Sequence, residues 1–450
     1  MKITSFGAIG LISLILLSGC GTVKTQREWT RLAEVTGNFT DQEILWEQSY
    51  EDEKKIQEEI GKILIDNILT ESEAVRMTLI NNRRLQSTFE EIGISKADLV
   101  QAGLFHNPSL GILFRFPFEG NGTNIDLEGG FILSDLWQMP FRKKVASARM
   151  DAVIMEVSRA VLDAVIEAKI AYREVFYLSL KRDEIQKILE ESRKISEETG
   201  KRRNFGFMSE LDVSMAQSMV SSVEMELAKA EAAINMAKAH LDRILGIGRE
   251  HSDYGIEADV NEIPEMPDMK TLLQYAVDHR ADAQIARLRI REAERALKLE
   301  KTRILKHLGV SASYEKDVEG SEVIGPGVDL QIPIFDQNRA SIAKSRFILR
   351  RAKKELQAIE GQIKEEILID LERIRLYKTE IVIYEEKTIP LNQKAMEYAG
   401  KWVGAMQLNR LYLLETQKQL LQSQKDYLET QMELEHIFLE LERHLGGSLP

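Results

Sequence analysis

Histidine, cysteine and methionine are the side chains with which this sequence could bind a metal or act as a nucleophile. The seven histidines are scattered, and none is spaced with a second metal ligand on one helical face. Met208, Met215 and Met219 recur at helical spacing, which packing in an apolar core explains without a soft metal. The sequence has no GxxxxGK(S/T) phosphate loop, HExxH zinc motif or GxSxG elbow. We therefore predict no catalytic residue, no metal site and no cofactor, and we do not expect an enzyme.

The single cysteine, Cys20, could be acylated. Lys2 and the apolar run from Ile9 to Leu17 precede the small residues of LLSGC, a pattern typical of a cleaved export signal. LLSGC resembles a bacterial lipobox, so we predict a lipid anchor of diacylglycerol and palmitate on Cys20. An ordinary cleaved signal with a chance cysteine is the alternative, and it also places the protein outside the cytoplasm.

Composition excludes several classes of protein. The chain of 450 residues carries a net charge of −12, and no cluster of lysine and arginine stands out, so nucleic acid is not an expected partner. One cysteine permits no internal disulfide. A charged fraction of 29% with only nine prolines favours a helix-rich, well-solvated protein.

Two short regions alternate apolar and polar residues with a period of two. The first lies within NPSLGILFRFPFEGNGTNIDLEGGFILSDL, residues 107–136, and the second covers residues 308–318 and 323–334. We predict four strands of about 11 to 13 residues, each able to span the roughly 25 Å apolar band of an outer membrane. The apolar face, predicted to contact lipid, comprises Leu110, Ile112, Phe114, Phe116, Val310, Ile324, Val328, Leu330 and Ile332.

An internal repeat organises the chain. Gln86 matches Gln284 at an offset of 198 residues, and Gly200 matches Gly400 at an offset of 200. Each copy is predicted to contain a helix, two strands and a long helical hairpin. The predicted segments are a signal peptide (1–19), an N-terminal periplasmic segment (20–68), a first repeat (69–246), a linker (247–268), a second repeat (269–446) and a tail (447–450).

The helices of each repeat differ in length. A helix of about 33 residues is expected before the strands of the first repeat, over residues 71–103. Long helices follow the strands, over about 141–198 and 338–398, and would reach roughly 85 to 90 Å. Return helices are expected over 209–245 and 409–444. Their apolar residues recur at three and four, as in coiled coils, so each long helix should pack against partners along its length.

Four strands cannot form a membrane structure by themselves. Lipid offers no hydrogen-bond partner to an open strand edge, so strands in a membrane must close into a barrel. We therefore expect several chains to contribute to one barrel. Two soluble hairpins laid on helices are the alternative that alternation alone permits.

Several dispersed stretches carry a resemblance to a known family. EAVRMTLINNRRLQ, ADLVQAGLFHNPSL, FGFMSELDVSMAQ, IPIFDQNRASIAKS and LYLLETQKQLLQSQKDYLETQMELE are similar to the TolC-like outer-membrane efflux channels, or outer-membrane factors. The resemblance covers both repeats, from about residue 69 to residue 446. It implies a mainly α protein with transmembrane β structure, whose homotrimer forms a 12-stranded β-barrel and a periplasmic α-helical tunnel.

The resemblance also implies partners and a location. The protein would be lipid-anchored in the bacterial outer membrane, extend into the periplasm, and pass substrate from an inner-membrane efflux pump and a periplasmic membrane-fusion adaptor to the exterior. The turns of the two hairpins would form the periplasmic tip. The residues predicted to contact the adaptor there are Lys201, Arg203, Phe205, Gly206, Phe207, Lys401, Trp402 and Gly404.

Glu210 and Asp212 are the candidates for an acidic entrance gate. The family's second hairpin commonly carries an LDLL-like run, whereas this chain has Tyr412 at the acidic position, so the gate would rest on the first repeat. Acidic residues favoured at a helix N-terminus are the alternative explanation of both residues. For the whole protein, the alternative function is a periplasmic coiled-coil lipoprotein that acts as a structural or adaptor protein without a pore.

Overall fold

The computed structural model describes residues 23–449 except 38, 117, 119–121, 249–252, 258–263, 265 and 405–409. The predicted signal peptide and Cys20 lie outside the described residues. The chain forms two compact units. The first comprises Met1–Leu32, Phe89–Ser158 and Ala281–Glu360, and the second comprises Ala33–Thr88, Arg159–Arg280 and Gly361–Pro450.

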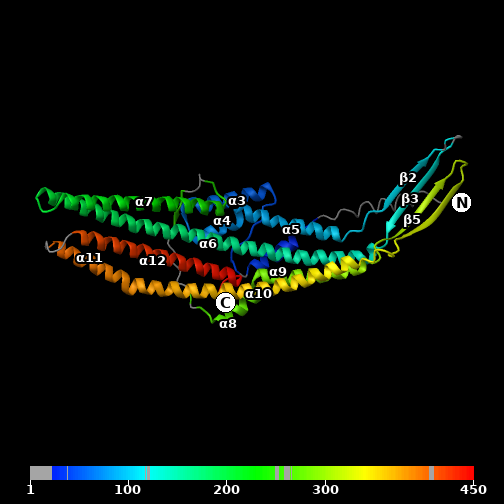
Figure 1. Ribbon diagram of the computed structural model, residues 1–450. Coiled ribbons are helices and arrows are strands. Elements are labelled where there is room, and N and C mark those ends of the chain that lie inside the picture. The colour runs from blue at the N-terminus through cyan, green and yellow to red at the C-terminus, as the bar shows by residue number, and fades with distance from the viewer. Residues whose placement is uncertain are drawn as a thin grey trace. The chain divides into compact units, whose positions relative to one another are not determined.

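Both repeats contain the same order of elements (Figure 1). The first repeat consists of α4 (Glu71–Asn81), α5 (Arg83–Ala102), β2 (Ser109–Arg115), β3 (Asn124–Ile132), α6 (Asp135–Asn204) and α7 (Glu210–Leu245). The second consists of α8 (Met269–His279), α9 (Ala281–Thr302), β5 (Leu308–Lys316), β6 (Glu322–Leu330), α10 (Arg339–Ile383), the π-helical turn η3 (Tyr384–Thr388), α11 (Ile389–Gly404) and α12 (Arg410–Leu445).

Short elements precede each repeat. The N-terminal segment contains α2 (Gln26–Thr36), α3 (Tyr50–Ile63), η1 (Leu64–Asp66) and β1 (Ile68–Leu69). The strand β4 (Gly255–Ile256) follows α7, and β1 pairs with it in parallel. The Tyr172 hydroxyl on α6 lies 2.9 Å from the carbonyl oxygens of both Leu69 and Glu257, and this contact ties the small sheet to α6.

The prediction of one helix over residues 71–103 is wrong, because the helix breaks at Asn82. Asn82 is extended, and its side-chain oxygen accepts from the Leu85 backbone N–H at 3.0 Å, which caps α5. Its side-chain nitrogen donates to the carbonyl oxygen of Ile244 at 2.8 Å, and Asn81 donates to that of Leu245 at 2.9 Å. The break therefore satisfies orphan carbonyls at the C-terminal end of α7.

The second repeat has the same break, at Arg280 between α8 and α9. The Arg280 backbone N–H still donates to Ala276, and its guanidinium pairs with Glu366 on α10 at 2.5 Å. Gly446, at the end of α12, has a φ of +85° and lies against the Arg280 backbone, where a Cβ would approach the Arg280 Cα to 2.9 Å. In both repeats the return helix therefore ends against a helix junction.

The first long helix exceeds its predicted length. The 70 residues of α6 correspond to about 105 Å of continuous helix. The long helix of the second repeat was predicted as continuous, but η3 interrupts it with one π-helical turn. Both return helices begin and end within one residue of their predicted bounds. At the start of α7, the Ser209 side chain accepts a hydrogen bond from the Asp212 backbone N–H in a capping box.

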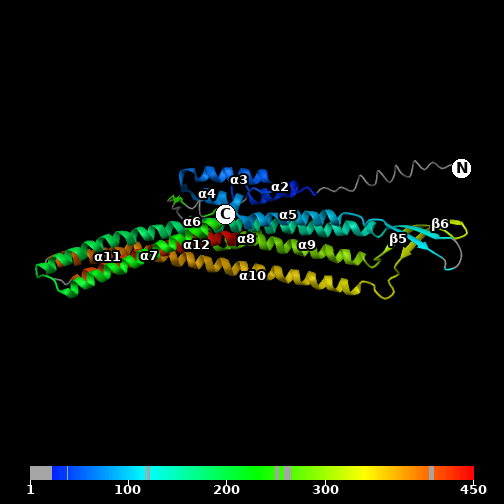
Figure 2. The same cartoon turned by 90° about the horizontal axis from the view of Figure 1, so that it is seen from above.

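The four long strands form one antiparallel sheet in the order β2-β3-β5-β6 (Figure 1; β6 is labelled in Figure 2). They contain 7, 9, 9 and 9 residues, so the predicted 11 to 13 residues are too many. Phe116 and Ile332, predicted within strands, lie just beyond the ends of β2 and β6. Pro333 follows Ile332 and has no backbone N–H with which to extend the ladder.

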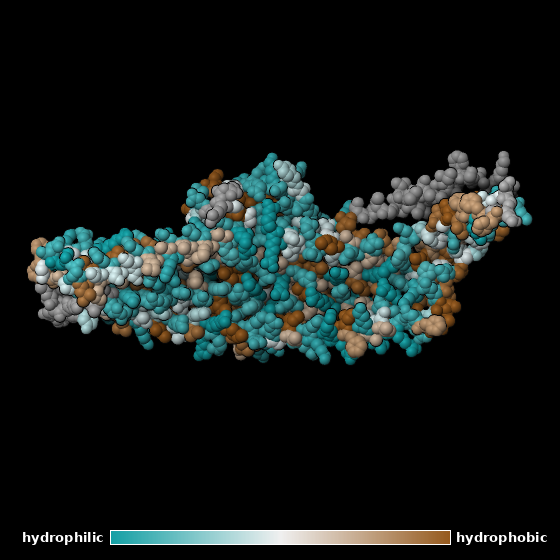
Figure 3. Space-filling view, turned by 45° about the horizontal axis from the view of Figure 1, so that its top comes forward, coloured by the Kyte–Doolittle hydropathy of each residue, from teal (hydrophilic) through white to brown (hydrophobic). Residues whose placement is uncertain are grey.

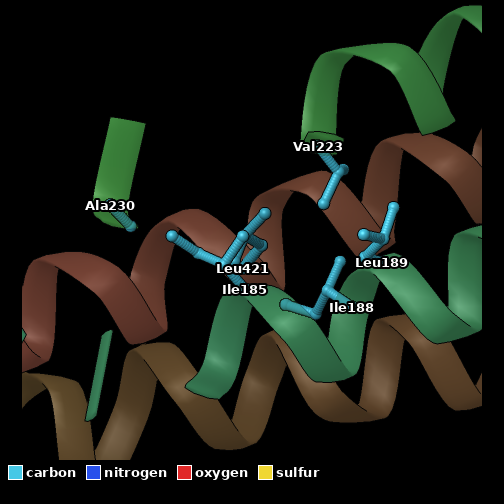
Figure 4. Close-up of a cluster of buried hydrophobic side chains, with 6 residues drawn as sticks. All are labelled: Ile185, Ile188, Leu189, Val223, Ala230 and Leu421. Atoms are coloured by element: carbon cyan, nitrogen blue, oxygen red, sulfur yellow. The ribbon is translucent and has the colours of Figure 1, made fainter. Parts of the chain in front are cut away.

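Apolar side chains fix the first hairpin within the second unit. Ile185, Ile188 and Leu189 on α6 are at most 9% exposed. They point toward Val223 and Ala230 on α7 and toward Leu421 on α12 (Figure 4). Burial of each large aliphatic side chain contributes about 1.5 to 3 kcal/mol to folding.

A buried ion-pair network connects three helices of the same unit. Arg173 on α6 pairs with Glu71 on α4 at 2.6 Å and with Glu435 on α12, and all three side chains are at most 16% exposed. Burial is the main cause that raises the pKa of Glu435, although Arg173 acts in the opposite direction. The guanidinium therefore stabilises carboxylates that would otherwise be buried without a partner.

Candidate functional site

One face of the four-stranded sheet is apolar and exposed. The register places Leu110, Ile112 and Phe114 of β2 on the same face as Val310 of β5 and the apolar residues of β6. Ile324 and Val328 are 79% and 73% exposed. Figure 3 shows hydrophobic side chains over the strands. An exposed apolar face of this extent indicates contact with lipid or another chain.

The opposite face of the sheet is polar and rich in glycine. Across the strands, Gly111, Glu128, Ser313 and Gly325 lie in one row. A second row joins Leu113, Asp126, Glu315 and Val323. Many positions on this face are glycine or serine, which have little or no side chain. A few other residues carry all the charge of the face.

Arg115 is the cation of this polar face. Its guanidinium pairs with Asp126 on β3 and lies 3.6 Å from Glu315 on β5. The remaining carboxylates of the face belong to Glu128, which is exposed, and to Asp329, which lies 3.2 Å from His307. Within the strands, this face therefore carries Arg115 against four carboxylates.

The sheet has two open edges. Among the described strands, β2 pairs only with β3, and β6 pairs only with β5. The outer edges of β2 and β6 thus present backbone N–H and C=O groups available to further strands.

The turn between α6 and α7 exposes apolar side chains. Gly206 has a φ of +79°, a conformation in which a side chain would be strained, and it closes the turn by donating to Arg203 at 2.8 Å. Phe205 and Phe207 are 76% and 63% exposed, and Leu211 is 68% exposed. Large apolar side chains that are this exposed do not belong to the apolar core of the second unit, so the turn is a candidate surface for docking.

The two gate candidates have local partners in this turn. Asp212 accepts from the Ser209 hydroxyl at 2.7 Å and from its backbone N–H at 2.9 Å, which completes the capping box. Glu210 pairs with Arg203 across the turn at 2.6 Å, and both side chains are at least half exposed. Asp212 therefore has the capping role that its position favours, whereas Glu210 retains an exposed carboxylate.

The last turns of the two long helices carry matching ion pairs. Lys201 pairs with Glu197 in α6, and Lys401 pairs with Glu397 in α11, both four residues apart. In each pair a hydrogen bond from the lysine is the first cause that lowers the pKa of the glutamate. Gly404 ends α11, while the side chain of Trp402 and residues 405–409 lie outside the described part of the chain.

Two features are absent from the described residues. No group of three or more histidine, cysteine, aspartate or glutamate side chains there is arranged to hold a metal ion. None of the described helices combines the length and the apolar composition needed to cross a membrane.

Two features of the site were missed at the level of sequence. The alternation separates Arg115 from the apolar face, but only the strand register brings it to Asp126 and Glu315. The capping signature SELD was visible at residues 209–212, and it identifies the role of Asp212.

Known proteins resemble the chain. The cobalt-zinc-cadmium resistance protein CzcC of Cupriavidus metallidurans is 20% identical over 359 residues, which are 78% of this chain and 84% of CzcC. The structure of the outer membrane protein VceC of Vibrio cholerae matches with a TM-score of 0.69 at 19% identity, covering 84% of this chain and 97% of VceC. No model of a protein family matches the chain.

A third match extends further along the chain. The CmeC outer membrane channel of Campylobacter jejuni matches with a TM-score of 0.70 at 15% identity, covering 93% of this chain and 92% of CmeC. The chain therefore has the fold of these outer-membrane proteins, and the predicted resemblance is confirmed at the level of the fold.

Proposed function

We propose that the protein is the outer-membrane exit channel of a tripartite efflux or secretion system. The observation that carries this proposal is the four-stranded sheet, which has an exposed apolar face, a polar face and two open edges. A sheet of this kind suits a barrel wall between lipid and water. The shared fold with VceC and CmeC supports the same assignment.

The proposed assembly is a homotrimer. Four strands cannot close around a lumen, whereas three chains would supply twelve strands and join each outer edge of β2 to an edge of β6 in a neighbouring chain. Diacylglycerol and palmitate on Cys20 would anchor the same assembly in the outer membrane.

The polar face would line the conducting pathway. Its strands carry Arg115 against Asp126, Glu128, Glu315 and Asp329, so three copies would surround the lumen with an excess of carboxylates. Fixed negative charge along a pore raises the local concentration of cations. We therefore expect the channel to prefer cations.

The hairpin turns would form the periplasmic end, where adaptor and pump connect. Phe205 and Phe207 would supply apolar contacts to a membrane-fusion adaptor, together with the basic and glycine residues of both turns predicted for this surface. Glu210 is the stronger gate candidate, because Asp212 is engaged in capping its own helix. An inner-membrane pump would deliver the substrate to this end.

Interchain disulfides test the proposed barrel. In a Cys20→Ser background with a non-lipid signal, Ile112→Cys on β2 is combined in turn with Ile324→Cys, Val328→Cys or Leu330→Cys on β6, all on the apolar face. One combination should give covalent trimers on non-reducing gels, because disulfides require Cα atoms within about 7 Å.

The control places cysteine at Leu127 on the inner strand β3, with the same β6 partners. Leu127→Cys should give no covalent trimer, because β3 is already paired on both sides. Absence of trimers in all three β2 combinations, or equal yields with Leu127→Cys, would contradict the proposed closure.

A further inference from the structure

A cavity of about 480 Å³ lies within the second unit, and no residue of the four-stranded sheet or of the hairpin turns lines it. It is formed by the start of α5, the middle of α6, the C-terminal part of α7 and the C-terminal part of α12. Leu85, Ala164 and Ile170 provide an apolar part of the wall. This volume is in the range of sites for small molecules.

The rest of the cavity wall is densely charged. Three carboxylates line it, from Asp163, Glu167 and Glu440. Five basic side chains face them, from Arg84, His240, Arg243, His436 and Arg443. Together these eight residues are all the ionisable groups of the wall, and they come from each of the four helices.

Most of these groups pair within the wall. Glu167 pairs with Arg243 at 3.1 Å and lies 3.9 Å from His240. Glu440 pairs with Arg443 at 3.1 Å and lies 3.7 Å from His436. Glu167 and Glu440 therefore each already have a guanidinium and an imidazole beside them.

Two guanidinium groups keep unused donors. Among the described residues, Arg84 forms no ion pair with a carboxylate. The Nε of Arg443 is buried and makes no hydrogen bond within the described structure, although Asp163 lies 3.5 Å away. A buried donor without an acceptor is unfavourable, and a ligand that accepts a hydrogen bond there would remove the penalty.

We propose that this cavity binds a small multivalent oxyanion, phosphate-like or a polycarboxylate, through Arg84 and Arg443. The planar guanidinium matches the paired oxygens of such anions. This site is separate from the proposed channel function, and nothing in that function requires it.

Acidification should strengthen binding. Three arginines balance three carboxylates in the wall, so their formal charges sum to zero, and protonation of His436 adds one positive charge. A hydrogen bond with Glu440 is the main cause that raises the pKa of His436, and burial raises that of Asp163. An imidazole gains its charge within about pH 5 to pH 8, so protonation of His436 makes the cavity more positive as the pH falls through that interval.

The site would join the two repeats. Arg243 and Arg443 occupy equivalent positions near the ends of the two return helices, at an offset of 200 residues. An anion held between Arg443 on α12 and Arg84 on α5 would add a link between the repeats, and a ligand that binds only the folded state stabilises it.

Isothermal titration calorimetry of the purified full chain in detergent tests the proposal. Sulfate represents phosphate-like anions, and oxalate represents polycarboxylates. Both anions keep a constant charge between about pH 6 and pH 8, so a change in affinity reports on the protein. Sodium chloride holds the ionic strength fixed. We expect binding of at least one anion, and about tenfold tighter binding near pH 6 than near pH 8. Binding of sulfate alone or oxalate alone identifies which chemistry the cavity prefers.

Two variants and a control locate the site. Arg84→Gln should weaken binding about tenfold through the loss of a charge-assisted hydrogen bond, and His436→Gln should reduce the gain on acidification. Arg83→Gln is the matched control, because Arg83 pairs with Glu47 at 2.9 Å and does not line the cavity. No heat from either anion at either pH, or equal affinity in Arg84→Gln and Arg83→Gln, would overturn the proposal.

Discussion

The two helical hairpins occupy equivalent positions in the two repeats, but different contacts hold them. In the first, Ile185 on α6 is 1% exposed in an apolar cluster against which Leu227 on α7 packs. At an offset of 200 residues the second hairpin has Glu385 and Tyr427, and the Tyr427 hydroxyl donates to Glu385 at 2.6 Å. A hydrophobic contact of the first hairpin thus corresponds to a hydrogen bond in the second.

The backbone differs at the same place. In the first hairpin α6 remains α-helical through Ile185, Ile188 and Leu189, and all three side chains are buried. In the second, residues 384–388 form a π-helical turn, and none of those described residues is buried. Continuous apolar packing fixes a helix at every turn, whereas a few polar contacts permit a local change in winding. A duplicated architecture can therefore contain one firmly packed hairpin and one that is more easily opened.

The largest expected effect concerns the equivalent arginines 173 and 373. Arg173→Met should destabilise the second unit by about 3 to 5 kcal/mol, because Glu71 and Glu435 would remain buried without their cation. Arg373→Met, at an exposed position, should change the free energy of unfolding by less than about 0.5 kcal/mol. Thermal unfolding followed by circular dichroism compares the two variants. Equal losses of stability would show that the buried ion-pair network contributes no more than an exposed arginine.

The next effect compares the two hairpin interiors directly. Ile185→Ala should cost about 2 to 5 kcal/mol, since it leaves a cavity in the apolar cluster. Glu385→Ala should cost only about 1 kcal/mol, the loss of one hydrogen bond. Native-state hydrogen exchange of α6 and α10 measures both costs locally. A larger cost in the second hairpin would reverse the comparison.

A smaller effect should follow the loss of the tyrosine hydroxyl. Tyr427 also accepts from Gln431 at 2.7 Å, so Tyr427→Phe removes two hydrogen bonds beside the π-helical turn. We expect faster hydrogen exchange in residues 384–392 by about five- to tenfold and unchanged exchange in residues 184–192. If exchange accelerates equally in both segments, the tyrosine does not act locally.

The smallest effect concerns a feature that the hairpins share. The pKa of Glu197 and of Glu397 is lowered from the ordinary value of 4.5, first through a hydrogen bond from the lysine four residues later. Each pair therefore stabilises its helix end above about pH 4.5, and this contribution is lost as the pH falls through the lowered value. Protection factors for hydrogen exchange in the last turns of α6 and α11 should therefore fall by similar factors as the pH drops below 4.5. Glu197→Gln and Glu397→Gln should remove this dependence, each in its own hairpin.

Much of the fold could be predicted from the sequence, because its signals are local. Alternation located the four strands and their apolar face, and apolar residues recurring at three and four located α7 to within one residue of its start. The repeat offset gave the same order of elements in the second copy. These features depend on residues that are neighbours in sequence, so propensity and periodicity are sufficient to find them.

The missed features depend on contacts between distant residues. The breaks at Asn82 and Arg280 lie in unbroken helical patterns, and each is set by the end of a return helix. The π-helical turn lies beside Tyr427, which is 42 residues from Glu385. The charged cavity requires four helices, so no short window of sequence contains it.

The central claim is that this chain forms a channel, and conductance across a planar lipid bilayer tests it most directly. The purified full chain should give long-lived, stepwise openings that prefer cations. Ser313→Arg, on the polar face, should still insert but show a weaker preference for cations, whereas Phe114→Arg, on the apolar face, should insert poorly because it costs about 2 to 4 kcal/mol near the middle of the bilayer. Membrane-inserted protein that shows no stepwise conductance, or two variants with the same behaviour, would contradict the account.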